Sequence, residues 1–282
     1  DMVRDGELAA SHFLKAALQA LDVEEHSSVT QGLLGRIATC LSAFLPPAVR
    51  RELVPGIADR LLELARAAQD GSDKQLQLVR ALAAHAVTGE QLDVVAGLLE
   101  GTKTLSGLDI DQDLRWDLLI GLVAAGRSGE EQIRAEEARD RTTTGRERAA
   151  EARAAIPTPE AKQATWRALV DDTSMPNETQ VRVLRGLTNV ERRPELLAPF
   201  VGAYVEAIDS VWSSRTFHMA ENLLTGLWSC ATVGLDGADP AAALEGWLES
   251  HAQAPAALRR IVRENLDDTR RVARAQAAET SE

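Results

Sequence analysis

Residues 29–69 read VTQGLLGRIATCLSAFLPPAVRRELVPGIADRLLELARAAQ, and this stretch decides the fold. Its first half repeats apolar side chains every three or four residues, at Leu33, Leu34, Ile37, Leu41 and Phe44. The pattern stops at Pro46-Pro47 and then resumes at Leu53, Ile57, Leu61, Leu64 and Ala68, before Asp70-Gly71. This is the spacing of an amphipathic helix, and proline ends a helix because it has no N–H to donate. The stretch therefore predicts two consecutive helices joined by a short turn.

The same helical period continues along almost the whole chain, with capping residues at its breaks. Ser72, Thr158 and Asp239 each precede a helical pattern, and the last two stand directly before a proline. Three pairs have the spacing of a capping box: Thr88 with Gln91, Ser128 with Glu131, and Thr144 with Glu147. No segment alternates apolar and polar residues as a strand does. The sequence predicts an all-α chain of about fourteen helices.

Many consecutive helices of similar length favour one helical architecture. Stacked antiparallel pairs form an α-solenoid, in which each pair buries its apolar face on its neighbours. We expect such a superhelix, of the HEAT or armadillo kind, with a compact bundle as the competing architecture. The loop richest in turn residues, 101–113, is short and carries apolar side chains of its own. Since no linker is visible, we expect residues 1–282 to form a single helical domain.

The composition excludes several classes of protein. Hydrophobic residues make up 45% of the chain, yet no apolar run approaches the roughly 20 residues that span a bilayer. The net charge of −12 argues against nucleic acid, because binding to phosphates needs a basic surface. Cys40 and Cys230 are the only cysteines, which fits reduced thiols rather than a disulfide framework. We expect a cytoplasmic protein that binds neither nucleic acid nor a membrane.

No motif for catalysis, metal binding or cofactor binding occurs in the sequence. A thermolysin-like zinc site needs two histidines four residues apart with a glutamate between them, and none of the five histidines has that spacing. The nucleophile elbow and the phosphate-binding glycine motifs are also absent. Asp109, Asp111 and Asp113 alternate like the start of a calcium loop, but its glycine and closing glutamate are missing. We interpret them as an acidic cap of the next helix and predict no catalytic, metal or cofactor residue.

Two adjacent segments resemble a known family. Residues 111–133, DQDLRWDLLIGLVAAGRSGEEQI, are similar to a helix of bacterial aminopeptidase N in which an Arg-Trp pair precedes a leucine-rich run and a glycine stop. Residues 138–177, ARDRTTTGRERAAEARAAIPTPEAKQATWRALVDDTSMPN, resemble that family's acidic-Thr-x-x-Gly turn, alanine-rich helix, proline turn and Trp-bearing helix. Arg141 stands where a proline is common in the family, which leaves the shape of the turn open. The chain therefore resembles the C-terminal helical domain of bacterial aminopeptidase N, a family of gluzincin zinc metallo-aminopeptidases. The resemblance is strongest to the actinobacterial branch of that family.

The resemblance implies a role within a larger bacterial protein. The parent removes N-terminal residues from peptides, and its zinc ligands and catalytic glutamate lie upstream of this chain. The chain would be a non-catalytic domain that covers the active site and forms the peptide chamber. Its partners would be the upstream catalytic domain of the same polypeptide and peptide substrates. We expect a fragment that lacks the first helices of the domain, and the alternative is a free-standing α-solenoid scaffold for protein–protein interactions.

The middle of the chain is basic within an acidic protein. Residues 141–193 hold 10 basic and 7 acidic side chains. A peptide held by its N-terminus at the upstream zinc would send its carboxylate into the bowl, where arginine can bind it through two parallel hydrogen bonds. We predict carboxylate contacts from Arg182, Arg185, Arg146 and Arg153, with Arg148, Arg192 and Arg193 as further candidates. The alternative is that these arginines pair with Glu147, Glu151 and Glu178 on outer helix faces.

The first helix carries an apolar strip with no obvious neighbour. The strip consists of Leu8, Phe13, Leu14, Leu18 and Leu21. The ends of a solenoid normally need a polar cap. We therefore expect an exposed strip that frays, or that associates with a second copy through residues 7–21.

Overall fold

The structure is a computed structural model that describes residues 2–279. Within these residues it contains fourteen α-helices and no β-strand. The helices are α1 (Ala10–Val23), α2 (Ser27–Thr39), α3 (Pro47–Ala67), α4 (Asp73–His85), α5 (Gly89–Glu100), α6 (Gln112–Ala124), α7 (Glu130–Arg139), α8 (Thr143–Ala155), α9 (Pro159–Asp171), α10 (Asn177–Thr188), α11 (Phe200–Ser214), α12 (Phe217–Gly226), α13 (Pro240–Ser250) and α14 (Ala256–Glu279). Three short turns complete the chain: the π-helical η1 (Cys40–Phe44) and the 3-10 turns η2 (Pro194–Leu197) and η3 (Cys230–Thr232). The predicted all-α class and the predicted number of helices are confirmed.

The stretch that predicts two helices forms α2, η1 and α3. After α2 the helix continues as the wider π-helical turn η1. There the backbone N–H of Leu45 donates to the carbonyl of Cys40, five residues earlier, at 3.2 Å. Pro47 then opens α3, at a position where a helix N–H has no helical partner in any case. Pro55 lies inside α3 without ending it. The two helices are confirmed, and the π-helical turn between them is a feature that the spacing does not predict.

Side-chain caps set many of the helix boundaries. The hydroxyl of Ser72 accepts the N–H of Gln75 at 3.2 Å, as expected for the start of α4. Thr88 forms the predicted reciprocal box at the start of α5. Thr158 and Asp239 cap α9 and α13, each directly before a proline. These boundaries follow from local hydrogen bonds, which is why the sequence predicts them.

Two of the predicted capping boxes are wrong. The expected cap at Ser128 lies one residue later, where Gln132 accepts the N–H of Gly129. The expected cap at Thr144 lies two residues earlier, at Thr142. In both places several polar residues stand next to one another, so the local pattern does not choose between them.

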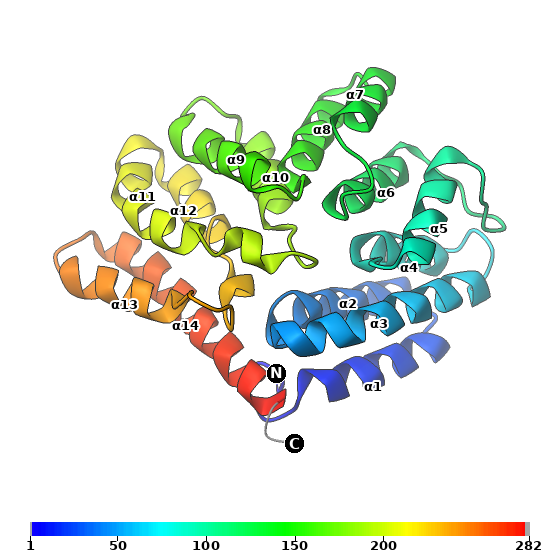
Figure 1. The fold of residues 1–282 in the computed structure, drawn as a ribbon, viewed down its shortest axis with the longest axis horizontal. Helices are drawn as coiled ribbons and strands as arrows, with labels where there is room; N and C mark the ends of the chain where they lie inside the picture. Colours follow the sequence, from blue (N-terminus) through cyan, green and yellow to red (C-terminus); the bar gives the residue numbers. More distant parts are fainter. Residues whose placement is uncertain (1, 280–282) are drawn as a thin grey trace.

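The helices form pairs that are arranged around a ring (Figure 1). Each odd-numbered helix packs on the even-numbered helix that follows it, and each even-numbered helix from α2 packs on the next one. The even-numbered helices lie nearer the middle of the ring and the odd-numbered helices nearer its rim (Figure 1). Contacts between α14 and α1 close the ring. This arrangement in two layers is compatible with the predicted superhelix of antiparallel pairs.

Two glycines let the inner helices approach one another closely. A Cβ atom at Gly121 of α6 would lie 2.2 Å from the carbonyl oxygen of Ala83 in α4. A Cβ atom at Gly186 of α10 would lie 2.2 Å from the carbonyl oxygen of Glu151 in α8. Such distances are impossible for real atoms, so any other residue would push the helices apart. The close spacing at these two contacts of the inner layer therefore depends on glycine.

Within residues 2–279, most buried apolar side chains belong to three clusters. The first core runs from Ala10 to Leu122 and joins α1 to α6. The second core runs from Ala154 to Leu266 and joins α8 to α14. The middle cluster lies mainly between α6 and α8 and consists of Trp116, Leu119, Ile120, Val123, Ala124, Ile133, Ala149, Ala152 and Ala155. Two large cores are thus linked by a smaller, alanine-rich one.

The expected exposed strip on the first helix is not present. Leu14 and Leu21 are buried, and Leu8, Phe13 and Leu18 are partly buried. The missing neighbour is α14, which packs on α1 from the other end of the chain. No apolar strip over residues 7–21 is therefore left to drive self-association, and that expectation loses its basis.

Candidate functional site

The Arg-Trp pair of the family resemblance is part of the framework between helices. Arg115 donates to both carboxylate oxygens of Glu136, from Nε at 2.8 Å and from Nη2 at 2.6 Å. Its Nη1 donates to the carbonyl of Leu99 at 3.0 Å. Burial alone would raise the pKa of Glu136, but the hydrogen bonds and charge of Arg115 outweigh burial and lower it. Arg115 therefore ties α6 to both α5 and α7.

Trp116 fixes the turn before α8. Its Nε1 donates to the carboxylate of Asp140 at 2.9 Å, and the Thr142 hydroxyl donates to the same carboxylate at 2.7 Å. Burial would raise the pKa of Asp140, but these hydrogen bonds outweigh burial and lower it. A Cβ atom at Gly145 would lie 2.2 Å from the carbonyl oxygen of Asp140, which explains the glycine of the turn. Arg141 is exposed, so its departure from the family's proline disturbs none of these contacts.

Two of the four predicted carboxylate contacts already have acidic partners. Arg153 pairs with Glu130 at 3.1 Å and with Glu137 at 2.7 Å. Arg182 pairs with Glu151 at 3.4 Å. The further candidates also have partners: Arg148 pairs with Asp117 and Glu151, Arg192 donates to the carbonyls of Ala83 and Ala86, and Arg193 pairs with Glu195 and donates to the carbonyl of Pro157. Much of the local positive charge is thus neutralised within the chain.

Arg146 and Arg185 have no carboxylate partner among residues 2–279. Arg146 donates to the carbonyl of Arg141 at 3.3 Å and to the hydroxyl of Thr143 at 3.1 Å. Arg185 is exposed, and its side chain makes no hydrogen bond to the described part of the chain. Helical spacing puts it on the side of α10 opposite Val183, which is buried. Since α10 belongs to the inner layer, this side faces the middle of the ring.

A ladder of alternating charges runs along four successive inner helices. Arg80 of α4 pairs with Asp117 of α6 at 2.9 Å, and Asp117 also pairs with Arg148 of α8. Arg148 pairs with Glu151 at 2.8 Å, and Glu151 in turn pairs with Arg182 of α10. Because the Arg148 and Glu151 side chains are only 10% and 11% exposed, removal of one partner would leave a poorly solvated charge. The ladder holds the inner layer in register.

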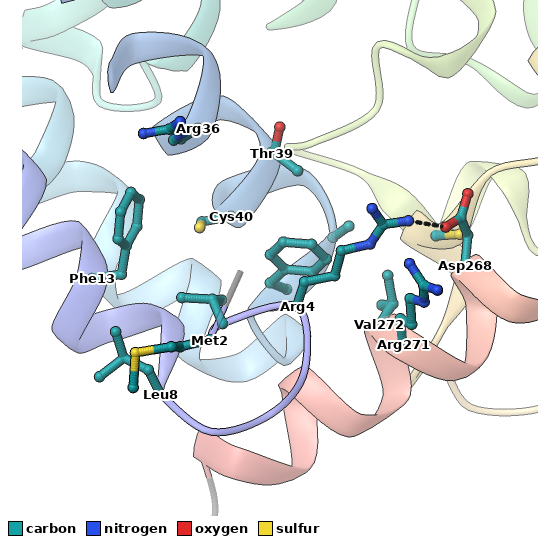
Figure 2. A pocket seen from close by; sticks show the side chains of 14 residues that line it. Met2, Arg4, Leu8, Phe13, Arg36, Thr39, Cys40, Asp268, Arg271 and Val272 are labelled. Atoms are coloured by element: carbon teal, nitrogen blue, oxygen red, sulfur yellow. Dashed lines mark hydrogen bonds and ion pairs between the residues drawn. The ribbon is translucent and has the colours of Figure 1, made fainter. Parts of the chain in front are cut away.

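A cavity of about 710 Å³ lies where the ring closes, between the N-terminal segment, η1 and α14 (Figure 2). Phe13, Phe44 and Val272 contribute apolar walls. Arg4 donates to Asp268 at 2.6 Å at its edge (Figure 2). The cavity therefore combines an apolar wall with a charged edge.

A second cavity of about 520 Å³ adjoins the first. Thr39, Ala43 and Cys230 line both cavities, so η1 stands between them. On the far side the second cavity reaches Asn189 and Glu191, just after α10. π-helical turns often occur at functional sites, because the extra residue displaces side chains from the regular helix. The two cavities thus lie beside the turns η1 and η3, near the closure of the ring.

The two cysteines line this space without being reactive. Burial raises the pKa of Cys40 to about 12 and the pKa of Cys230 to about 11, so both thiols stay protonated and are weak nucleophiles. The sequence predicts two reduced thiols and carries no signal for the cavity. Their positions are 40 and 230, and only the closed ring brings them to the same space.

Lys162 of α9 is completely buried. Its Nζ donates to the carbonyls of Ala154 at 2.7 Å and Gly186 at 2.9 Å. Both carbonyls lie in the last turn of a helix, where helical partners are missing. Burial lowers the pKa of Lys162 to about 7, and a neutral amine still has two N–H groups for these two carbonyls. Lys162 therefore caps α8 and α10 from the outer layer.

No group of three or more His, Cys, Asp or Glu side chains within residues 2–279 is placed to hold a metal ion. No helix in this range is long and apolar enough to cross a membrane.

Nearly the whole chain matches a known family. The model of the ERAP1-like C-terminal domain matches residues 1–271. The chain belongs to this family. Aminopeptidase N of Streptomyces lividans, a relative of this ERAP1-like domain, is 40% identical over 281 residues, which are 100% of the chain and 32% of that protein. The resemblance drawn from residues 111–177 is thereby confirmed, and the ERAP1-like domain spans about a third of the length of this relative.

Proposed function

We propose that this chain is the non-catalytic helical domain of a zinc metallo-aminopeptidase of the aminopeptidase N type, which covers the active site and forms the peptide chamber. The observation that carries the proposal is the similarity to aminopeptidase N along the whole chain. A ring of helices with adjoining cavities suits such a cover, because it can enclose a peptide and exclude bulk water. The domain would enclose the peptide and contribute charged side chains around it, without taking part in bond cleavage.

The zinc ion and the groups that cleave the peptide bond would lie outside this chain. The chain spans 32% of its relative, and its described residues form no group that fits a metal ion. The partner of the domain would be the upstream catalytic domain of the same polypeptide. We also infer that residues 1–282 are one domain of HEAT-like helix pairs in a cytoplasmic protein, where free thiols such as Cys40 stay reduced.

Arg185 is the residue that we propose for the carboxylate of a long peptide. Arg185 is exposed, lies on the side of α10 that faces the middle of the ring, and has no acidic partner in the described part of the chain. An acidic protein would otherwise repel the carboxyl end of a peptide. Arg182 and Arg153 pair with carboxylates, and Arg146 donates to a carbonyl and a hydroxyl, so these three would contribute to the local potential rather than bind directly.

Reversal of the charge at Arg185 tests this proposal. In the full-length protein, Arg185→Glu should lower kcat/KM for peptides of about ten residues by about three- to tenfold. A single-residue chromogenic substrate should react at an unchanged rate, because it is too short to reach α10. The matched control is Arg167→Glu on the outer helix α9, which is also exposed and has no partner in the described residues. Equal losses for both substrates, or for both variants, would contradict the assignment.

A further inference from the structure

The ring consists of two halves with separate cores. The first half, α1–α6, contains the first core, and the second half, α8–α14, contains the second core. On one side the halves meet through the middle cluster, where α6 packs on α8. This contact is built around Trp116 and three alanines of α8. The two larger cores are therefore joined on this side through a smaller cluster.

On the other side of the ring, the contact between the halves combines the apolar packing of α14 on α1 with several hydrogen bonds. The side chain of Gln276 in α14 donates to the carbonyl of Ala43 in η1 at 2.8 Å. The carboxylate of Glu279 accepts the N–H of Ser11 at 2.7 Å. The cavities of about 710 Å³ and 520 Å³ lie along this contact. The contact of α14 with α1 and η1 therefore leaves open space between the halves, unlike the contact through the middle cluster.

A short segment after α10 crosses from the second half to the first. In residues 189–193, Glu191 accepts from Nδ1 of His85 at 2.9 and 3.0 Å, one distance to each carboxylate oxygen. Arg192 donates to the carbonyl of Ala86 at 2.8 Å and to that of Ala83 at 3.3 Å. These groups form the C-terminal end of α4, where carbonyls lack helical partners and a positive charge is favourable. The segment thus holds α4 by two adjacent side chains.

The contact of Glu191 is buried and electrostatically favourable. The Glu191 side chain is 11% exposed and that of His85 is 6% exposed. Burial would raise the pKa of Glu191, but His85, Arg192 and Arg50 outweigh burial and lower it, so the carboxylate stays charged. Arg50 is itself 2% exposed, and its Nε and Nη1 have no hydrogen-bond partner in the described residues. Glu191 therefore lies in a positively charged environment at the C-terminal end of α4.

On the side away from α4, the segment borders a cavity. Asn189, Val190 and Glu191 line the cavity of about 520 Å³. Val190 is buried in the second core, so the segment remains anchored in the second half when Glu191 and Arg192 lose their contacts with α4.

We propose that residues 189–193 are a releasable strut, which holds the two halves at one separation while it is bound to the end of α4 and lets them rotate about the α6–α8 contact when it is released. Release widens the two cavities between the halves. The strut is a device of this domain alone, and it stands whether or not the domain serves a peptidase.

Distance measurements between the halves test the strut in the full 282-residue chain. Spin labels are placed at Ala67→Cys on α3 and Gln163→Cys on α9, two exposed positions, after Cys40 and Cys230 are changed to alanine. With the strut intact, we expect a narrow distance distribution by pulsed electron spin resonance. With Glu191→Ala and Arg192→Ala together, the distribution should become at least about twofold wider, because more than one separation is populated.

The matched control is Glu195→Ala, whose side chain is 58% exposed and pairs with Arg193 rather than with α4. It should leave the distribution unchanged. Circular dichroism verifies that the helices remain, and if the double variant does not fold, the single variant Arg192→Gln is measured in the same way. A folded variant without strut contacts whose distribution equals that of the Glu195→Ala control would overturn the proposal.

Discussion

Replacement of Gly186 by alanine should lower the free energy of unfolding by about 3 kcal/mol or more. The new Cβ atom would lie 2.2 Å from the carbonyl oxygen of Glu151 and 2.7 Å from Cβ of Ala154. Neither atom belongs to a flexible side chain, so α10 would have to move away from α8. That movement would also disturb the hydrogen bond from Lys162 to the carbonyl of Gly186.

Urea unfolding followed by circular dichroism measures this effect. The matched control is Gly246→Ala in α13, where nothing lies within 4 Å of the new Cβ atom. That variant should be about 0.5–1 kcal/mol more stable than the parent, because alanine favours a helix interior. If Gly186→Ala were as stable as Gly246→Ala, the inner helices would not depend on close contact at this position.

Replacement of Trp116 by alanine should have an effect of similar size, about 3–5 kcal/mol. Trp116 is completely buried in the middle cluster, and its loss would leave a cavity between α6 and α8. The buried carboxylate of Asp140 would also lose the donor that lies 2.9 Å away. Both effects act on the contact that joins the two halves of the ring.

Trp116→Phe separates the two contributions. It keeps most of the apolar volume and removes the hydrogen bond, so it should lower the free energy of unfolding by about 1.5–3 kcal/mol. Both variants are measured by urea unfolding against the unaltered chain. An equal loss for phenylalanine and alanine would mean that the volume of Trp116 is unimportant for the middle cluster.

The fold could largely be predicted because its signals are local. Helical spacing, proline stops and caps such as Thr88 lie within a few residues of one another, and they fixed the number of helices and several boundaries. The caps of α7 and α8 differ from the predicted ones, because neighbouring residues such as Ser128 and Gly129 are both common at the start of a helix. The π-helical turn η1 has no such local signal.

The features that failed prediction depend on contacts between distant parts of the chain. The apolar strip of α1 is covered by α14, which no pattern near residues 7–21 reveals. Arg192 is one of the candidates for peptide binding. In the structure it donates to the carbonyl of Ala86 at the end of α4, 106 residues away in sequence. The carboxylate partners of Arg153 and Arg182 likewise come from other segments, whereas the exposure of Arg185 leaves its prediction open to test.

The most direct test of the central claim is to find what the far end of an enzyme-bound peptide touches. A peptide of about ten residues, which spans at most about 36 Å, carries a zinc-binding hydroxamate at one end and a photoreactive group at the other. It is bound to the full-length protein, irradiated and located by mass spectrometry. If this domain forms the peptide chamber, the label should lie on the inner helices, including the segment of α10 that contains Arg185. Label on the outer helices, such as α9 and α11, or only outside residues 1–282, would contradict the account.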